Sequence, residues 1–304
     1  MKPITRRRVM LLEEFIITVY CCIDNHLTKR FSATPYRSHG FAPKLSDSEV
    51  ITMEIVGEFL GMDQDKQIWS YFLRHWKNWF PNIGHRSTFV RQSANIWKIK
   101  QILQEALARE IGAFEDAVHI IDGFPIPVCL FARARRKSCF KGVAGYGRCA
   151  AKKSVYFGFK GHLLITLSGI ISNFTLTPGN IEEHHLAEEL TSSIKGLVIG
   201  DKGFIGAALK KRLKEKEIDL ETPLKKNMKD NRPEGFVSYL KLLRRKIETV
   251  IGQLTGRFHL AKVWAHDAWH AIGRIGRKLL AHTIGVFLNK QLGRSLIKLE
   301  GLID

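Results

Sequence analysis

The chain has 304 residues, enough for two domains, and its 45% hydrophobic and 25% charged residues are typical of a globular protein. Its formal net charge of +19 exceeds what solubility requires, which favours a polyanionic partner, either nucleic acid or an anionic membrane surface. The membrane alternative is disfavoured because no apolar run approaches the roughly 20 residues that a spanning helix needs. The five cysteines are odd in number and contain no CxxC pair, which fits a reducing cytoplasm better than a disulfide framework.

Residues 1–112 have a helical pattern and are expected to form a separate N-terminal domain. Ser46 and Glu49 form a capping box before an amphipathic helix that ends near Gly61. A second helix follows, and Ser87 is expected to cap a third that carries Arg86 and Arg91. Short consecutive helices with a basic last member indicate a helix-turn-helix type DNA-binding domain. The alternative is a helical packing domain that does not touch DNA.

From residue 113 to 304 strands alternate with helices, which predicts a second domain with a central sheet. A short strand is expected to end at Asp122, and another at Asp201. Between these two strands we expect a hairpin formed by residues 157–167 and 170–177, followed by a helix at 186–194. After the second strand we expect a helix at 204–217, a short strand at 218–221 and a long helix from 237 onward. The fold class is therefore α/β, with an all-helical domain in front of it.

Three acidic residues carry the chemistry that we predict. Asp122 and Asp201 follow strands, and Glu248 borders the apolar stripe of the long helix, where it can face the strand ends. Three convergent carboxylates repel one another unless a cation joins them, and hard oxygen ligands select Mg²⁺ or Mn²⁺. Two such ions about 3.5–4 Å apart can clamp a phosphodiester. Taken singly, an aspartate at a strand end is more often a turn or cap residue.

Several motifs occur together in one order and resemble the DDE transposases of bacterial and archaeal insertion sequences. They are Ile120–Pro125, Tyr156–Leu163, Thr177–Asn180, Ile199–Phe204 and Arg244–Thr249, with Leu45–Glu49 and Phe80–Pro81 nearer the N-terminus. The resemblance implies a ribonuclease H-like mixed sheet flanked by helices, with Asp122, Asp201 and Glu248 as catalytic ligands of two Mg²⁺ or Mn²⁺ ions. It also implies cleavage and strand transfer at the terminal repeats of an element, and a homodimer or higher oligomer on double-stranded DNA. A cytoplasmic protein associated with the nucleoid is then expected.

Related groups carry Tyr, Arg, Glu and Lys on one helix. Arg244 and Glu248 fit that signature, but Lys241 stands at the Tyr position and Thr255 at the Lys position. Arg244 is a candidate for phosphate contact, and its alternative is an ordinary salt bridge with Glu248 one turn away.

Residues 131–160 contain nine lysines or arginines and no acidic residue, which predicts a phosphate-binding segment beside the site. Phe140 and Tyr146 within it could stack on an unpaired base. The alternative is a solvated, mobile loop. The predicted DNA-binding residues are Arg133, Arg135, Arg136, Lys137, Lys141, Arg148, Lys152, Lys153 and Lys160, together with Arg244, Arg86 and Arg91.

Two other functions compete with transposition. One is a catalytically idle DNA-binding protein derived from a transposase, and the other is a ribonuclease H-like nuclease without strand transfer. Cleavage of DNA that carries the element ends would exclude the first, and joined products would exclude the second.

Overall fold

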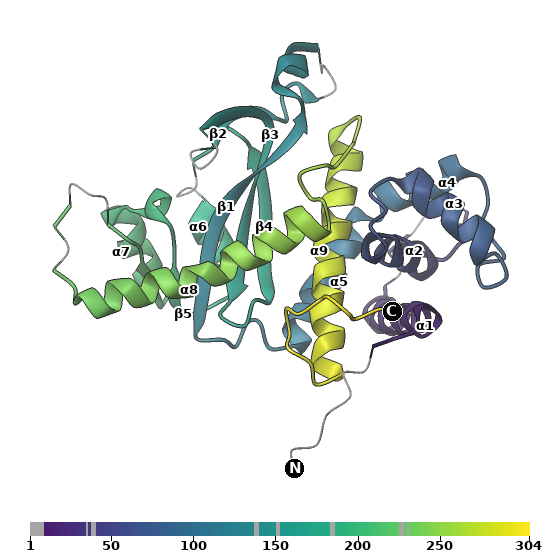
Figure 1. Ribbon diagram of the computed structural model, residues 1–304, viewed down its shortest axis with the longest axis horizontal. Coiled ribbons are helices and arrows are strands. Elements are labelled where there is room, and N and C mark those ends of the chain that lie inside the picture. Colours follow the sequence, from purple (N-terminus) through teal and green to yellow (C-terminus); the bar gives the residue numbers. More distant parts are fainter. Residues whose placement is uncertain are drawn as a thin grey trace. The chain divides into compact units, whose positions relative to one another are not determined.

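The computed structural model describes residues 9–34, 36, 37, 41–136, 140–149, 153–182, 186–224, 228, 229 and 231–304 (Figure 1). The chain divides into two compact units. The helical unit contains the chain up to Leu107, Arg257–His259 and Val263–Asp304, and the sheet unit contains Ala108–Gly256 and Leu260–Lys262. The first boundary lies close to the one expected at residues 112 and 113. The last 42 residues, however, cluster with the N-terminal helices, whereas the sequence placed them with the sheet.

The helical unit is built from helices of ordinary length around an apolar core. They are α1 (Leu12–Phe31), α2 (Asp47–Phe59), α3 (Asp65–His75), α4 (Arg86–Asn95), the first part of α5 (Trp97–Glu110) and α9 (Ala268–Gln291). The capping box of α2 is confirmed, since Ser46 Oγ accepts from the Glu49 amide and Glu49 Oε2 accepts from the Ser46 amide. His85, rather than Ser87, caps α4, because its Nδ1 accepts from the Ser87 amide.

A group of fully buried charges explains why α9 belongs to the helical unit. We call it the buried ionic cluster, and its members are Glu54, Glu58, Asp65, Lys100, Arg277 and Lys278. Arg277 Nη1 contacts Asp65 Oδ1 at 2.6 Å, and Lys278 Nζ contacts Glu58 Oε2 at 2.9 Å. Burial alone would raise the pKa of Asp65, but Arg277 and Arg274 lower it to about 2. Buried charges persist only when they are paired, so α9 is tied to α2 and α3 by its basic residues.

The sheet unit contains a six-stranded mixed sheet in the order β2-β3-β1-β5-β6, with β4 paired to β3. The strands are β1 (Val118–Cys129), β2 (Gly145–Cys149), β3 (Ser154–Thr166), β4 (Ile171–Pro178), β5 (Gly196–Ile199) and β6 (Ile218–Glu221). The central strand β1 runs antiparallel to β3 and parallel to β5, and β5 runs parallel to β6. The mixed α/β architecture expected from the sequence is therefore present in this unit.

Helices lie on both faces of the sheet. Ile121, Leu164 and Val198 are buried against α6 (Ala187–Leu190) and α7 (Ala207–Glu215). The long helix α8 (Glu234–Gly252) contacts β1 and crosses in front of it in Figure 1. Because side chains alternate along a strand, Asp122 points away from the Ile121 face and towards α8.

The prediction that a short strand ends at Asp122 was wrong, because β1 continues to Cys129. Beyond Ile120 its β5 side has no ladder partner in the described sheet, whereas β3 still pairs along the other side. Pro125 and Pro127 lie in this half, and an open edge tolerates a residue without an N–H. In the described residues, no helix is long and apolar enough to cross a membrane.

Candidate active site

Asp122 and Asp201 hold equivalent positions relative to the paired parallel segments of β1 and β5. The last ladder pair of β1 and β5 joins Ile120 to Ile199, and each aspartate follows two residues later. Residues two apart in an extended chain point to the same face, so both carboxylates lie on the α8 side of the sheet. Each accepts a hydrogen bond from the next backbone amide, Asp122 Oδ1 from Gly123 at 2.8 Å and Asp201 Oδ1 from Lys202 at 2.6 Å.

Arg244 on α8 joins the two carboxylates. Its Nη2 donates to Asp122 Oδ2 at 3.3 Å, and its Nη1 lies 3.4 Å from Asp201 Oδ1. The side chains of Arg244 and Asp122 are 17% and 16% exposed, whereas that of Asp201 is 41% exposed. One guanidinium therefore spans the pair, and the ion pairs that the structure gives Arg244 are with these aspartates rather than with Glu248.

Glu248 lies one helical turn after Arg244 on α8 and is exposed. Residues four apart share a helix face, so Glu248 is beside the bridge. In the part of the chain that the structure describes, no three His, Cys, Asp or Glu side chains are arranged to hold a metal ion. The structure thus brings two of the three predicted ligands together, and the metal-binding roles of all three stay predictions.

The donor set fits a hard cation. Carboxylate oxygens are the ligands that Mg²⁺ and Mn²⁺ prefer. The space between Asp122 and Asp201 already accommodates the positive charge of a guanidinium, and Glu248 would add a third carboxylate from α8. The residues present are thus chemically suited to divalent ions, which would be bound by Asp122, Asp201 and Glu248.

His162 belongs to the motif Tyr156–Leu163 and had no predicted role of its own. It lies beside Asp122 in the sheet, but on the opposite face of the sheet from the carboxylates. It pairs with Gly123 across β1 and β3, is fully buried, and its Nε2 lies 2.9 Å from Thr177 Oγ1. Burial, assisted by the charge of Lys160, lowers the pKa of His162 to about 4. It is therefore neutral at pH 7 and belongs to the interior of the sheet, not to the carboxylate site.

The described residues of the basic segment at 131–160 lie mostly in regular structure, unlike the mobile loop that was the alternative interpretation. It contains a 3-10 helix (Phe131–Arg136), all of β2 and the first half of β3. The exposed basic residues are Arg133, Arg135, Lys141, Arg148 and Lys153, and Lys160 is half-buried. Lys137, Lys152 and the side chain of Arg136 lie outside the described residues.

The exposed basic residues lie where β1 and β3 extend beyond the carboxylates. Lys160 pairs with Pro125, three residues along β1 from Asp122, and it shares the sheet face of His162, opposite to that of the carboxylates. The prediction that Phe140 stacks on a base was wrong, because Phe140 is buried against Phe159. Tyr146 is 48% exposed, and its ring lies 5.7 Å from that of Phe131. An aromatic pair thus accompanies the exposed charges.

Arg86 and Arg91, the predicted DNA contacts in the N-terminal part, are on α4 and are exposed. Exposure is what a phosphate contact requires, but it does not separate DNA binding from a solvated helix face.

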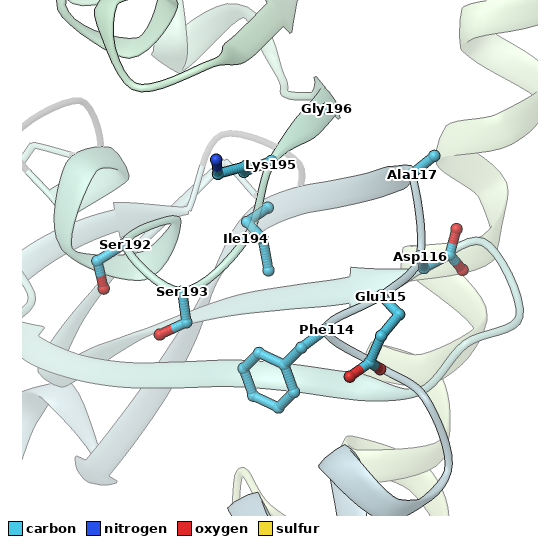
Figure 2. A pocket seen from close by; sticks show the side chains of 9 residues that line it. All are labelled: Phe114, Glu115, Asp116, Ala117, Ser192, Ser193, Ile194, Lys195 and Gly196. Atoms are coloured by element: carbon cyan, nitrogen blue, oxygen red, sulfur yellow. The ribbon is translucent and has the colours of Figure 1, made fainter.

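A pocket of about 550 Å³ lies at the opposite end of strands β1 and β5 from the two aspartates (Figure 2). It is lined by Phe114–Ala117, which precede β1, and by Ser192–Gly196, which precede and begin β5. The pocket is therefore at the amino ends of the parallel strands, whereas Asp122 and Asp201 are beyond their paired carboxyl ends. Ligands of open α/β sheets bind at the carboxyl ends, so the carboxylate site is the better candidate.

Comparison with known proteins identifies a family match that covers this part of the chain. Residues 113–263 match the protein family described as "Transposase DDE domain". The matched segment includes every strand of the sheet together with Asp122, Asp201, Arg244 and Glu248. This match, over about half of the chain, supports a DDE transposase.

Two further comparisons add little. None of the curated proteins matches the chain. The solved structure of a piggyBac transposase synaptic complex with hairpin DNA is 12% identical, with a TM-score of 0.39, and the match covers 97% of this chain and 84% of that one. A likeness of this degree does not establish a shared fold.

Proposed function

We propose that this protein is the transposase of a bacterial or archaeal insertion sequence, which binds the terminal repeats of the element and cleaves and rejoins DNA. The observation that carries the proposal is the convergence of Asp122 and Asp201 on Arg244, one turn from Glu248, inside the segment that matches the DDE domain. The mixed sheet with helices on both faces supports a ribonuclease H-like catalytic domain.

The proposed reaction has two balanced steps. In hydrolysis, a water oxygen bonds to phosphorus, the bond between phosphorus and the 3′ oxygen breaks, and the leaving 3′ oxygen takes a proton that the water loses. In strand transfer, the oxygen of that 3′-hydroxyl bonds to a phosphorus of target DNA, the bond between this phosphorus and the target's own 3′ oxygen breaks, and the leaving 3′ oxygen takes the proton that the attacking hydroxyl loses. Two Mg²⁺ or Mn²⁺ ions held by Asp122, Asp201 and Glu248 would supply charge that activates the nucleophile and stabilises the leaving oxygen.

Double-stranded DNA is the proposed partner, both as element ends and as target. Exposed Arg133, Arg135 and Arg148 near the extended end of β1 support contacts with phosphates. Since two element ends have to be paired, a homodimer or higher oligomer on DNA is proposed, in the cytoplasm and at the nucleoid. The formal net charge of +19 supports a polyanionic partner.

One observation favours a second candidate, the catalytically idle DNA-binding protein. Within the described residues the three carboxylates are not gathered into a metal site, and Arg244 fills the space between two of them. A protein that kept the fold and lost the chemistry would have this appearance too.

The deciding experiment incubates the full chain with linear DNA that ends in the inverted repeats flanking its coding region. Nicks and joined products on a target plasmid are measured with Mg²⁺, with Mn²⁺ and with a chelator. The proposal predicts metal-dependent nicks at the repeats followed by joined products. Binding without nicks would support the idle protein, and nicks without joined products would support a nuclease.

A further inference from the structure

We propose that Arg244 is a built-in competitor of the divalent ions: its guanidinium occupies the Asp122–Asp201 pair in the metal-free protein and has to leave before ions bind there. The inference rests on the proposed function, because it takes the two aspartates to be metal ligands. It goes beyond that function in assigning Arg244 control over metal loading.

The electrostatics of the pair require some cation. Two carboxylates that face the same helix repel one another, and Arg244 supplies the positive charge that offsets this repulsion. An arginine side chain does not lose its proton in a protein. Its charge can therefore leave the aspartates only if the side chain moves, and a divalent ion between the same oxygens would repel it.

The contacts of Arg244 are those of a weakly held group. Its distances of 3.3 Å and 3.4 Å are longer than the 2.7–2.9 Å typical of charge-assisted hydrogen bonds. Its Nε is buried, and no hydrogen-bond partner for it is present in the described chain. Arg277 in the buried ionic cluster is the contrast, since its Nη1 contacts Asp65 at 2.6 Å and its Nη2 donates to the Asp63 carbonyl at 2.9 Å.

The aspartates themselves stay in place without Arg244. Asp122 follows the strand pairing of β1, Asp201 caps a short 3-10 helix, and each carboxylate keeps the hydrogen bond from its neighbouring amide. Arg244 lies in the middle of α8, so its release needs only side-chain rotation. The pair is thus a preformed site that the guanidinium of Arg244 covers.

The test compares Mn²⁺ affinity of the full chain without DNA, measured by isothermal titration calorimetry. Arg244→Gln removes the competing charge, and the expected result is a Kd about tenfold lower than that of the wild type. The matched control is Arg245→Gln, which removes the same charge from the adjacent, exposed residue of α8. A Kd of Arg244→Gln for Mn²⁺ equal to or higher than that of the wild type would overturn the inference. An equal decrease of the Kd in Arg244→Gln and Arg245→Gln would overturn it as well.

Arg244→Lys is the second variant in case Arg244→Gln does not fold. It keeps the charge but cannot span both carboxylates as a fork, so Mn²⁺ should again bind more tightly than in the wild type. Titration of Asp122→Asn separates this inference from the proposed function. If Asp122→Asn abolishes Mn²⁺ binding while Arg244 variants match the wild type, only the competition is wrong. If Asp122→Asn leaves Mn²⁺ binding unchanged, the ligand assignment is wrong as well.

Discussion

Asp122 and Asp201 each lie two residues beyond Ile120 and Ile199, the last pair in the ladder of the parallel strands β1 and β5. Backbone pairing sets this relative position of the two residues, so it does not depend on what their side chains bind. It places two carboxylates opposite α8 without any need for a loop to fold over the sheet. Asp122 lies inside β1, and Asp201 lies two residues after the end of β5, where it caps a 3-10 helix.

Replacement of the three acidic residues tests their role as ligands. We expect Asp122→Asn, Asp201→Asn and Glu248→Gln each to reduce cleavage of end-containing DNA at least about a thousandfold, because each removes a charged ligand of the ions. Binding of the same DNA, measured by gel shift with a chelator present, should change less than about threefold.

The control for Glu248 is Glu234→Gln, since Glu234 is an exposed glutamate in the first turn of the same helix. It should cleave at the wild-type rate. Normal cleavage by Glu248→Gln would show that Glu248 is not a metal ligand. Another group would then have to be the third ligand beside the two aspartates.

Neutralisation of basic residues tests the DNA surface. Arg133 and Arg135 are exposed on the 3-10 helix after β1, and we expect the double change to Gln to weaken DNA binding. If each arginine neutralises one phosphate, the slope of log K against log salt should become shallower by about 1.8 in total.

Lys210→Gln with Lys214→Gln is the matched control, because these lysines of α7 are paired with Glu221 and Asp219. Their loss should leave the slope unchanged. An identical slope in the Arg133 and Arg135 variant would show that these arginines form a solvated surface.

The buried ionic cluster should dominate the stability of the helical unit. Glu58→Gln leaves Arg277 and Lys278 buried beside an uncharged group, and the expected loss of unfolding free energy is about 3–5 kcal/mol. Urea unfolding measures it. Glu217→Gln, which breaks an exposed pair with Lys195, should cost no more than about 1 kcal/mol. Similar losses in both variants would contradict the cluster's role.

His162 makes stability depend on pH. Its folded pKa of about 4 lies below the usual 6.5, so the unfolded chain binds the extra proton between these values. Stability contributed by neutral His162 is therefore complete above pH 6.5 and is lost as the pH falls towards 4. When the pH is lowered from 7 to 5, the free energy of unfolding of His162→Gln, measured with urea, should fall by about 2 kcal/mol less than that of the wild type.

Exposed His75 provides the reference for that experiment, and His75→Gln should reproduce the pH dependence of the wild type. The same dependence in His162→Gln would mean that other groups, such as buried His282, account for it.

The sequence predicted what local patterns encode. The capping box at Ser46, the strand at Ile218–Glu221 and the hairpin of β3 and β4 all have short-range signals, and the structure contains each of them. The apolar runs before Asp122 and Asp201 were also predicted to be strands, and each lies in one, although only Asp201 follows the end of its strand.

Long-range pairing was not readable in the same way. β2 is hidden in a glycine-rich basic segment, and its pairing with β3 depends on residues that follow it. The extension of β1 past Asp122 was not predicted, and it includes Pro125 and Pro127, whose missing backbone N–H donors are acceptable there only because this edge of β1 is open. The ionic partners of Arg277 lie more than 200 residues away, so no spacing rule could find them.

The most direct test of the central claim is a structure of the full chain with Mn²⁺ and end-containing DNA, in which anomalous scattering locates the ions. We predict two ions about 3.5–4 Å apart, bound by oxygens of Asp122, Asp201 and Glu248, with Arg244 withdrawn from the aspartates. Ions bound elsewhere, or Glu248 still remote from the two aspartates while ions are present, would contradict the assignment.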